Sequence, residues 1–157
     1  MGVSGAGKST VGAALAERIG ARFVDADHLH PAANVEKMSA GIPLIDDDRW
    51  PWLDVVGRAI AEAPDGIVMA CSALRRSYRD AIRAQAPGAV FVLLSVDRGT
   101  LEYRMSHRDH FMPTSLLDSQ LVTLEPLAAD EAGVTVASDK DVDATAALVV
   151  EKLQARG

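Results

Sequence analysis

The chain has 157 residues, of which 48% are hydrophobic and 24% are charged. This balance is typical of one globular domain and excludes an intrinsically disordered chain. A net charge of −6 argues against general binding to nucleic acids or membranes, because such binding calls for a basic surface. The one cysteine, Cys71, excludes an internal disulfide, and we find no signal peptide or membrane-spanning apolar run, so we expect a cytoplasmic protein.

Short apolar runs alternate with helical patterns along the chain. The first helical pattern places Val11, Leu15 and Ile19 on one face and ends at Gly20. Four apolar runs then have the composition of buried strands, namely ARFVDA, GIVMACSAL, AVFVLLSV and GVTVAS. A final amphipathic helix is predicted over residues 142–153. The alternation predicts an α/β fold, with one parallel sheet and helices on both of its faces.

The opening stretch, MGVSGAGKST, matches the phosphate-loop pattern G-x-x-x-x-G-K-[ST]. Glycines allow successive backbone N–H groups to turn toward phosphate oxygens, and the following helix adds the positive end of its dipole. Lys8 can reach the β- and γ-phosphates, and Ser9 can ligate Mg²⁺. The predicted nucleotide-binding residues are Gly2, Val3, Ser4, Gly5, Ala6, Gly7, Lys8, Ser9 and Thr10.

A GTPase would carry two further motifs, D-x-x-G after a strand and N-K-x-D for guanine. DVVG at 54–57 lies in a helical stretch, and DEAG at 130–133 is far from the phosphate loop. SDKD at 138–141 lacks the asparagine. The pattern therefore favours a kinase, and a P-loop protein that binds nucleotide without catalysis is the alternative of another class.

Two carboxylates, Asp25 and Asp27, follow the strand that begins near Arg22. Alternation along an extended chain would send both to one side, at the ligand crevice of a parallel sheet. One could hold Mg²⁺ through water while the other engages the attacking hydroxyl. An acidic turn that caps the next helix is the alternative. His28 and His30 lack zinc-site spacing and are expected to be loop or substrate-contact residues.

Arginines recur in two later segments. In RRSYRDAIR, a helix would carry Arg75, Arg79 and Arg83 beside an apolar face, where the first turn could bind an anionic substrate. A solvated basic face is an equal alternative for Arg83. In LEYRMSHRDHFMP, Arg104 and Arg108 are four residues apart before a proline, which suits a mobile lid over the triphosphate, although surface arginines would fit equally well.

Four segments together resemble the gluconate kinases, small P-loop kinases related in fold to shikimate and adenylate kinases. They are GVSGAGKS, DADHLHPAANVEKMSAGIPLIDDDRWPWL, CSALRRSYRDAIR and HFMPTSLLDSQLVTLEPLAADE. The resemblance implies a single P-loop kinase domain over residues 1–157, with a lid at about 104–113. It also implies a five-stranded parallel sheet in the order 2-3-1-4-5 between two helical layers. The expected reaction is phosphorylation of the 6-hydroxyl of D-gluconate by Mg-ATP, and a homodimer is possible.

The resemblance also implies roles for individual residues. Asp25 would join Ser9 near the metal, and Asp27 would contact the substrate hydroxyl. Further expected substrate contacts are His30, Arg49 and Arg75, and the expected catalytic residues are Lys8, Asp27, Arg104 and Arg108. A shikimate kinase is the nearest alternative function.

Only Met1, Gly2 and Val3 represent the strand that precedes the phosphate loop in this family. The first strand is therefore expected to be truncated. We expect further apolar residues upstream of Met1, because a central strand pairs on both sides with its neighbours.

Overall fold

The computed structural model describes residues 1–107, 114–139 and 141–157. Strands and helices alternate as predicted, and each of the four apolar runs contains a strand. The strands are β1 (Arg22–Asp25), β2 (Ile67–Ala70), β3 (Phe91–Ser95) and β4 (Gly133–Ala137). The helices are α1 (Lys8–Ile19), α2 (Ala32–Ser39), α3 (Asp46–Ala61), α4 (Arg76–Gln85), α5 (Arg98–Ser106), α6 (Thr114–Thr123) and α7 (Val142–Arg156), with a 3-10 helix, η1, at Ala26–Leu29.

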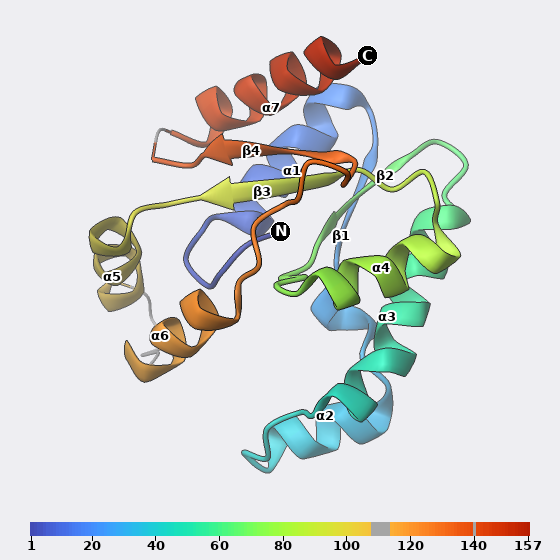
Figure 1. The fold of residues 1–157 in the computed structure, drawn as a ribbon, viewed down its shortest axis with the longest axis vertical. Helices are drawn as coiled ribbons and strands as arrows, with labels where there is room; N and C mark the ends of the chain where they lie inside the picture. The colour runs from blue at the N-terminus through green and yellow to red at the C-terminus, as the bar shows by residue number, and fades with distance from the viewer. Residues whose placement is uncertain (108–113, 140) are drawn as a thin grey trace.

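The strands form two parallel pairs, β1 with β2 and β3 with β4. The start of the chain lies between the two pairs (Figure 1). Met1 donates from its amine to the Val92 carbonyl at 2.6 Å and accepts from the Leu94 N–H at 3.0 Å, and Gly2 donates to the Ser72 carbonyl at 3.2 Å. The described residues show two pairs of strands, joined by these few bonds, so the expected five-stranded sheet in the order 2-3-1-4-5 stays a prediction.

Helices cover both sides of the strands (Figure 1). On one side, α1 and α7 pack together on β3 and β4 through Val11, Leu15, Leu94 and Val149. Ile19, predicted on the same buried face, is 52% exposed, because it is the last residue of α1 and left-handed Gly20 then turns the chain away.

On the other side, α3 packs against α4 around Trp52 and Ile82. The two helices approach closely at Gly57, where an added Cβ would lie 2.7 Å from the Gln85 Cβ. The indole N–H of Trp52 donates to the Ala26 carbonyl at 2.8 Å, so this buried tryptophan joins α3 to the end of β1. These contacts place the first turns of α3 and α4 at the carboxyl edge of β1 and β2.

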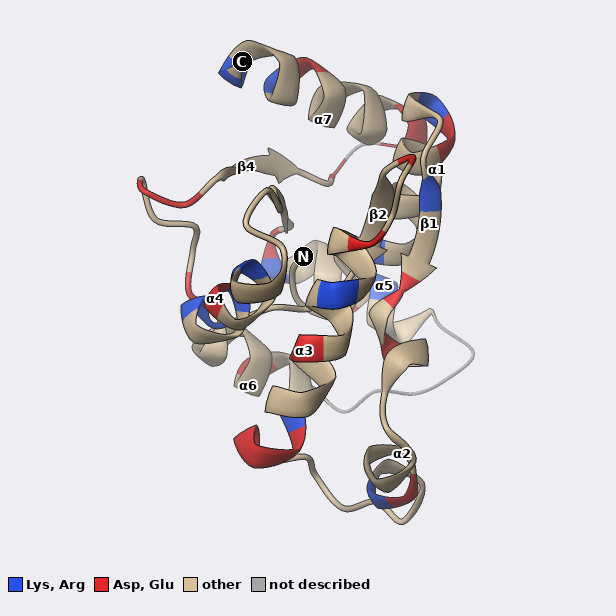
Figure 2. Ribbon diagram, turned by 90° about the vertical axis from the view of Figure 1, so that its right-hand side faces the viewer, with Lys and Arg blue, Asp and Glu red and all other residues tan. Residues whose placement is uncertain are grey.

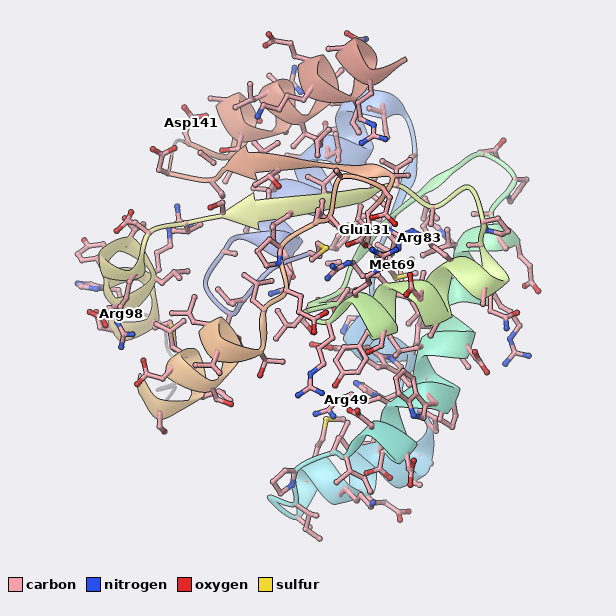
Figure 3. All side chains as sticks on the ribbon, in the orientation of Figure 1. Arg49, Met69, Arg83, Arg98, Glu131 and Asp141 are labelled. Carbon is pink, nitrogen blue, oxygen red and sulfur yellow. The ribbon has the colours of Figure 1, made fainter. Side chains whose placement is uncertain are left out.

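A buried ion pair ties α4 to the segment before β4. Arg79 and Glu131 are almost fully buried and 2.7 Å apart, and Arg79 also donates to the Ala73 carbonyl at 3.1 Å. Arg83 contacts the same Glu131 carboxylate at 2.9 Å, and the two residues are labelled next to each other in Figure 3. The Arg79 hydrogen bond holds the pKa of Glu131 well below its usual range. The prediction of a basic face that includes Arg79 is therefore wrong, because its guanidinium is buried in the core and hydrogen-bonded there.

An apolar cavity of about 380 Å³ lies between β2 and β3. Its walls include Val68 and Met69 on one side, Phe91 and Val92 on the other, and Met1 at one end. Burial lowers the pKa of the Met1 amine from 8.0 to about 5, because charge is costly in apolar surroundings. The expectation of further apolar residues upstream of Met1 stays a prediction.

In the 157-residue chain, where Met1 carries the terminal amine, burial of that amine predicts a pH-dependent stability. Between about pH 5 and pH 8 the unfolded chain carries a proton on Met1 that the folded chain releases, so the free energy of unfolding should rise with pH. Across this pH range, the free energy of unfolding should rise by an amount on the order of 4 kcal/mol. Urea unfolding across this range measures it, and an Nα-acetylated chain is the control because it cannot titrate there. Equal slopes for the two forms would contradict the prediction.

Candidate active site

The loop before α1 has the backbone that a phosphate site requires. Gly5 and Gly7 have φ values of 84° and 91°, which side chains other than hydrogen strongly disfavour. Gly7 is the N-cap of α1, and no side chain in the described ranges caps it. The first N–H groups of α1 can therefore serve a bound anion. Ser138 donates from its hydroxyl to the Ala6 carbonyl at 2.9 Å and so holds the loop from the end of β4.

Lys8 lies back over this loop. Its Nζ donates to the Val3 carbonyl at 3.0 Å, so the ammonium group stays beside the phosphate loop. This position fits the predicted contact with a nucleotide's outer phosphates.

Ser9 and Asp25 lie in contact, and Asp27 follows in the next turn of the chain. The Ser9 hydroxyl donates to Asp25 Oδ2 at 3.1 Å, across from α1 to the end of β1. The chain does not stay extended beyond Asp25 but turns into η1, whose Asp27 N–H donates to Asp25 Oδ1 at 3.0 Å. Asp25 therefore faces Ser9 and also caps η1, as the alternative interpretation expected, while its role at a metal stays a prediction. Asp27 is exposed at the start of η1.

The metal-binding potential of this region rests on oxygen atoms. Among the residues that the structure describes, no group of three or more His, Cys, Asp or Glu side chains is placed to hold a metal ion. Ser9 and Asp25 are hard oxygen donors of the kind that bind Mg²⁺ together with water and substrate phosphates. Their 3.1 Å approach thus fits Mg²⁺ in a nucleotide complex.

Arg104 lies beside the phosphate loop. It lies within α5, where its guanidinium donates to the Gly5 carbonyl at 3.1 Å and the Ser138 carbonyl at 2.5 Å. In this conformation two hydrogen bonds to backbone carbonyls hold Arg104 against the phosphate loop, and its membership of a mobile lid stays a prediction. Arg108 and most of the lid, at 108–113, lie outside the described residues.

A second cavity, also of about 380 Å³, opens beside Arg104 and the start of α1. The rings of Tyr103 and His107 lie 4.1 Å apart at its wall. Gly7 and Thr10 form another part of the lining. The cavity is therefore continuous with the phosphate loop and suits the remainder of a nucleotide.

The other expected substrate residues gather at the start of α3 and α4. Arg49 and Arg75 approach the same carboxylate, Asp46, at 2.9 and 4.0 Å. His30 stacks on Trp52 with ring centroids 4.2 Å apart, and partial burial lowers its pKa against the opposing effect of Asp27. The structure thus brings the two arginines together and places His30 against α3.

Three residues near the site were missed from the sequence. Asp46 lies three residues before Arg49 in the run DDDR, a helical pair spacing that could have shown it. Tyr78 lies on the apolar side of the helical pattern in RRSYRDAIR, which gives no sign of its contact with Asp46. Gln120 on α6 accepts from the Ser4 N–H at 2.7 Å, and no local pattern signals this contact.

Known proteins resemble this chain over most of its length. The family model "Shikimate kinase" matches residues 4–154, so fold and phosphate loop together define a P-loop kinase of that class. The gluconokinase of Gluconobacter oxydans is 46% identical over 159 residues, which cover 99% of this chain and 89% of that protein. The thermosensitive gluconokinase of Escherichia coli is 44% identical over 135 residues, 83% of this chain and 72% of that protein.

A solved structure agrees. The crystal structure of a gluconokinase from Sinorhizobium meliloti has a TM-score of 0.88 and 47% identity, and the match covers 99% of this chain and 90% of that one. The chain belongs to the gluconokinase family. The α/β P-loop kinase fold expected from the sequence is confirmed. In the described ranges, no helix is both long enough and apolar enough to cross a bilayer.

Proposed function

We propose that this chain transfers the γ-phosphoryl group of ATP to the 6-hydroxyl of D-gluconate. The observation that carries the proposal is the juxtaposition of a phosphate loop with the Ser9–Asp25 pair, 3.1 Å apart, in a chain of the gluconokinase family. Phosphoryl transfer depends mostly on positioning and on charge stabilisation, and the residues around this loop supply both.

The nucleotide side of the site would work through backbone and cation contacts. The amides of residues 2–10 would hold the phosphates, and Lys8 would stabilise charge on the transferred group. Ser9 and Asp25 would hold Mg²⁺, which neutralises phosphate charge when bound. Arg104 supports the loop from α5, and Arg108 is proposed as the arginine that reaches the triphosphate.

The acceptor side would work through a base and an anion site. Asp27, exposed beside the metal pair, would orient the attacking hydroxyl and accept its hydrogen bond. Arg49 and Arg75 would hold the gluconate carboxylate, because guanidinium groups match carboxylates in geometry and charge. His30 would contact substrate hydroxyl groups.

A substrate panel tests the proposal. Purified chain is given Mg-ATP with gluconate, other sugar acids, shikimate or a nucleoside monophosphate, and ADP release is measured. Gluconate should be the fastest acceptor. Faster turnover of shikimate or a nucleotide would overturn the assignment, and nucleotide binding without turnover of any acceptor would favour a non-catalytic P-loop protein.

Two expectations accompany this function. The reaction is proposed to occur in the cytoplasm, and a homodimer is proposed for the active form. Light scattering of the purified chain would measure its mass in solution and test the dimer directly.

A further inference from the structure

A single carboxylate joins the two arginines that face the acceptor side. Asp46 Oδ1 accepts from Arg49 at 2.9 Å and from the Tyr78 hydroxyl at 2.6 Å, and Asp46 Oδ2 lies 4.0 Å from Arg75. Figure 2 shows acidic residues in red at the start of α3, below α4, and Figure 3 labels Arg49 below α4. The cluster therefore consists of two cations around one anion.

Tyr78 anchors this cluster to the core. The tyrosine is 8% exposed, and its ring lies 5.7 Å from the Arg49 Cζ and 5.9 Å from the Arg75 Cζ. Trp50 packs edge-on against the same ring at 5.7 Å. The Tyr78 hydroxyl thus holds the Asp46 carboxylate in place, and both guanidinium groups lie close to the same aromatic ring.

The charge on Asp46 is well maintained. The Tyr78 hydrogen bond, together with Arg49, keeps the pKa of this carboxyl below its ordinary value. The side chains of Asp46, Arg49 and Arg75 are 40%, 32% and 47% exposed, so the cluster also faces solvent. It therefore presents a net charge of one positive unit to a ligand that approaches from outside, since two guanidinium groups surround one carboxylate.

We propose that Asp46 is a positioning residue that holds Arg49 and Arg75 together as one binding site for a singly charged carboxylate. The inference rests on the proposed function. Without the carboxylate, two neighbouring guanidinium groups would repel each other and separate. With the Asp46 carboxylate between them, both guanidinium groups stay in place, and their remaining N–H groups can donate to the two oxygens of a substrate carboxylate.

A purely structural role for Asp46 predicts different behaviour. An acidic residue in the first turn of α3 stabilises the helix through its dipole, and Asp47 and Asp48 occupy that turn as well. The helix N-terminus is closed by Asp48, which accepts from the Ile45 N–H at 3.0 Å, and not by Asp46. Loss of a helix-stabilising charge would lower the melting temperature and leave the KM for gluconate unchanged.

The test is a steady-state comparison of Asp46→Asn with the wild-type chain. Asparagine keeps the size and one acceptor oxygen but loses the charge, so the KM for gluconate should rise about 10-fold. The kcat and the KM for ATP should stay as in the wild type, because the nucleotide side is untouched. Asp47→Asn is the matched control: it removes the same charge one residue away, from an exposed side chain that makes no ion pair with either arginine among the described residues.

A second variant covers the case in which Asp46→Asn does not fold. Tyr78→Phe keeps both charges and the ring but removes the hydroxyl that anchors Asp46, so the KM for gluconate should rise in the same direction by a smaller factor. If the wild type is active and a folded Asp46→Asn or Tyr78→Phe chain keeps the wild-type KM for gluconate, the inference is overturned and the proposed function is not. Equal effects of Asp46→Asn and Asp47→Asn on that KM would overturn it in the same way. A wild type that is inactive on gluconate would overturn the proposed function, and this inference with it.

Discussion

Replacement of Lys8 by alanine should abolish phosphoryl transfer and leave the chain folded. The Lys8 ammonium lies 3.0 Å from the Val3 carbonyl, beside the phosphate loop, where the proposed reaction would develop charge on the transferred group. Loss of one such preorganised donor costs about 10³-fold in kcat, and a full positive charge should cost at least that much. The kcat, from ADP release with gluconate, and the melting temperature, from circular dichroism, measure the two parts of the prediction.

Lys152→Ala is the matched control for this experiment. It removes the same side chain from α7, where Nζ contacts the Thr135 carbonyl at 2.8 Å, away from the phosphate loop. The control should turn over at the wild-type rate. Near-normal turnover in a folded Lys8→Ala chain would show that the loop works without its lysine and would refute the assigned role.

Asp27→Asn should lower kcat by about 10²-fold or more, which is the usual contribution of a positioned base. The asparagine keeps the size of the side chain but cannot accept a proton from the attacking hydroxyl. In the structure the carboxylate that caps η1 belongs to Asp25, and Asp27 contributes only its backbone N–H to that bond. The fold and ATP binding should therefore survive the substitution, as melting curves and nucleotide titration would show.

Asp65→Asn provides the control, since Asp65 is an exposed aspartate in the turn before β2. It should change neither kcat nor stability. If Asp27→Asn instead kept its kcat and lost only stability, Asp27 would be a structural residue of the turn, which is the alternative that its spacing left open.

Local pattern was sufficient for most of the fold. The apolar runs at β2 and β3 have strand composition and length, and Val11 and Leu15 repeat at helical spacing, so these elements are readable without their neighbours. The Ser9–Asp25 contact was also predictable from the sequence. The phosphate loop follows a central strand and Asp25 ends a neighbouring parallel strand, so both lie at the same edge of the sheet.

Other features depend on contacts between distant residues. Arg79 has the spacing of a surface arginine. It is a core residue because it pairs with Glu131, which lies 52 residues later in the chain. The proline that follows Arg104 suits a lid, but the local pattern gives no sign of its partners, Gly5 and Ser138, which come from opposite ends of the chain. Periodicity describes one element at a time and cannot foresee which distant carbonyl an arginine will meet.

The bond between Ser138 and Ala6 has a consequence for how the protein is made. The phosphate loop leaves the ribosome well before the hydroxyl that fixes it, which lies 132 residues further along the chain. Met1 likewise finds its carbonyl partner 91 residues away. Contacts across such separations form slowly, because long stretches of chain must close before they contribute. The nucleotide site therefore cannot assemble on a growing chain until β4 has been synthesised, so the phosphate loop is made long before it gains its native contacts.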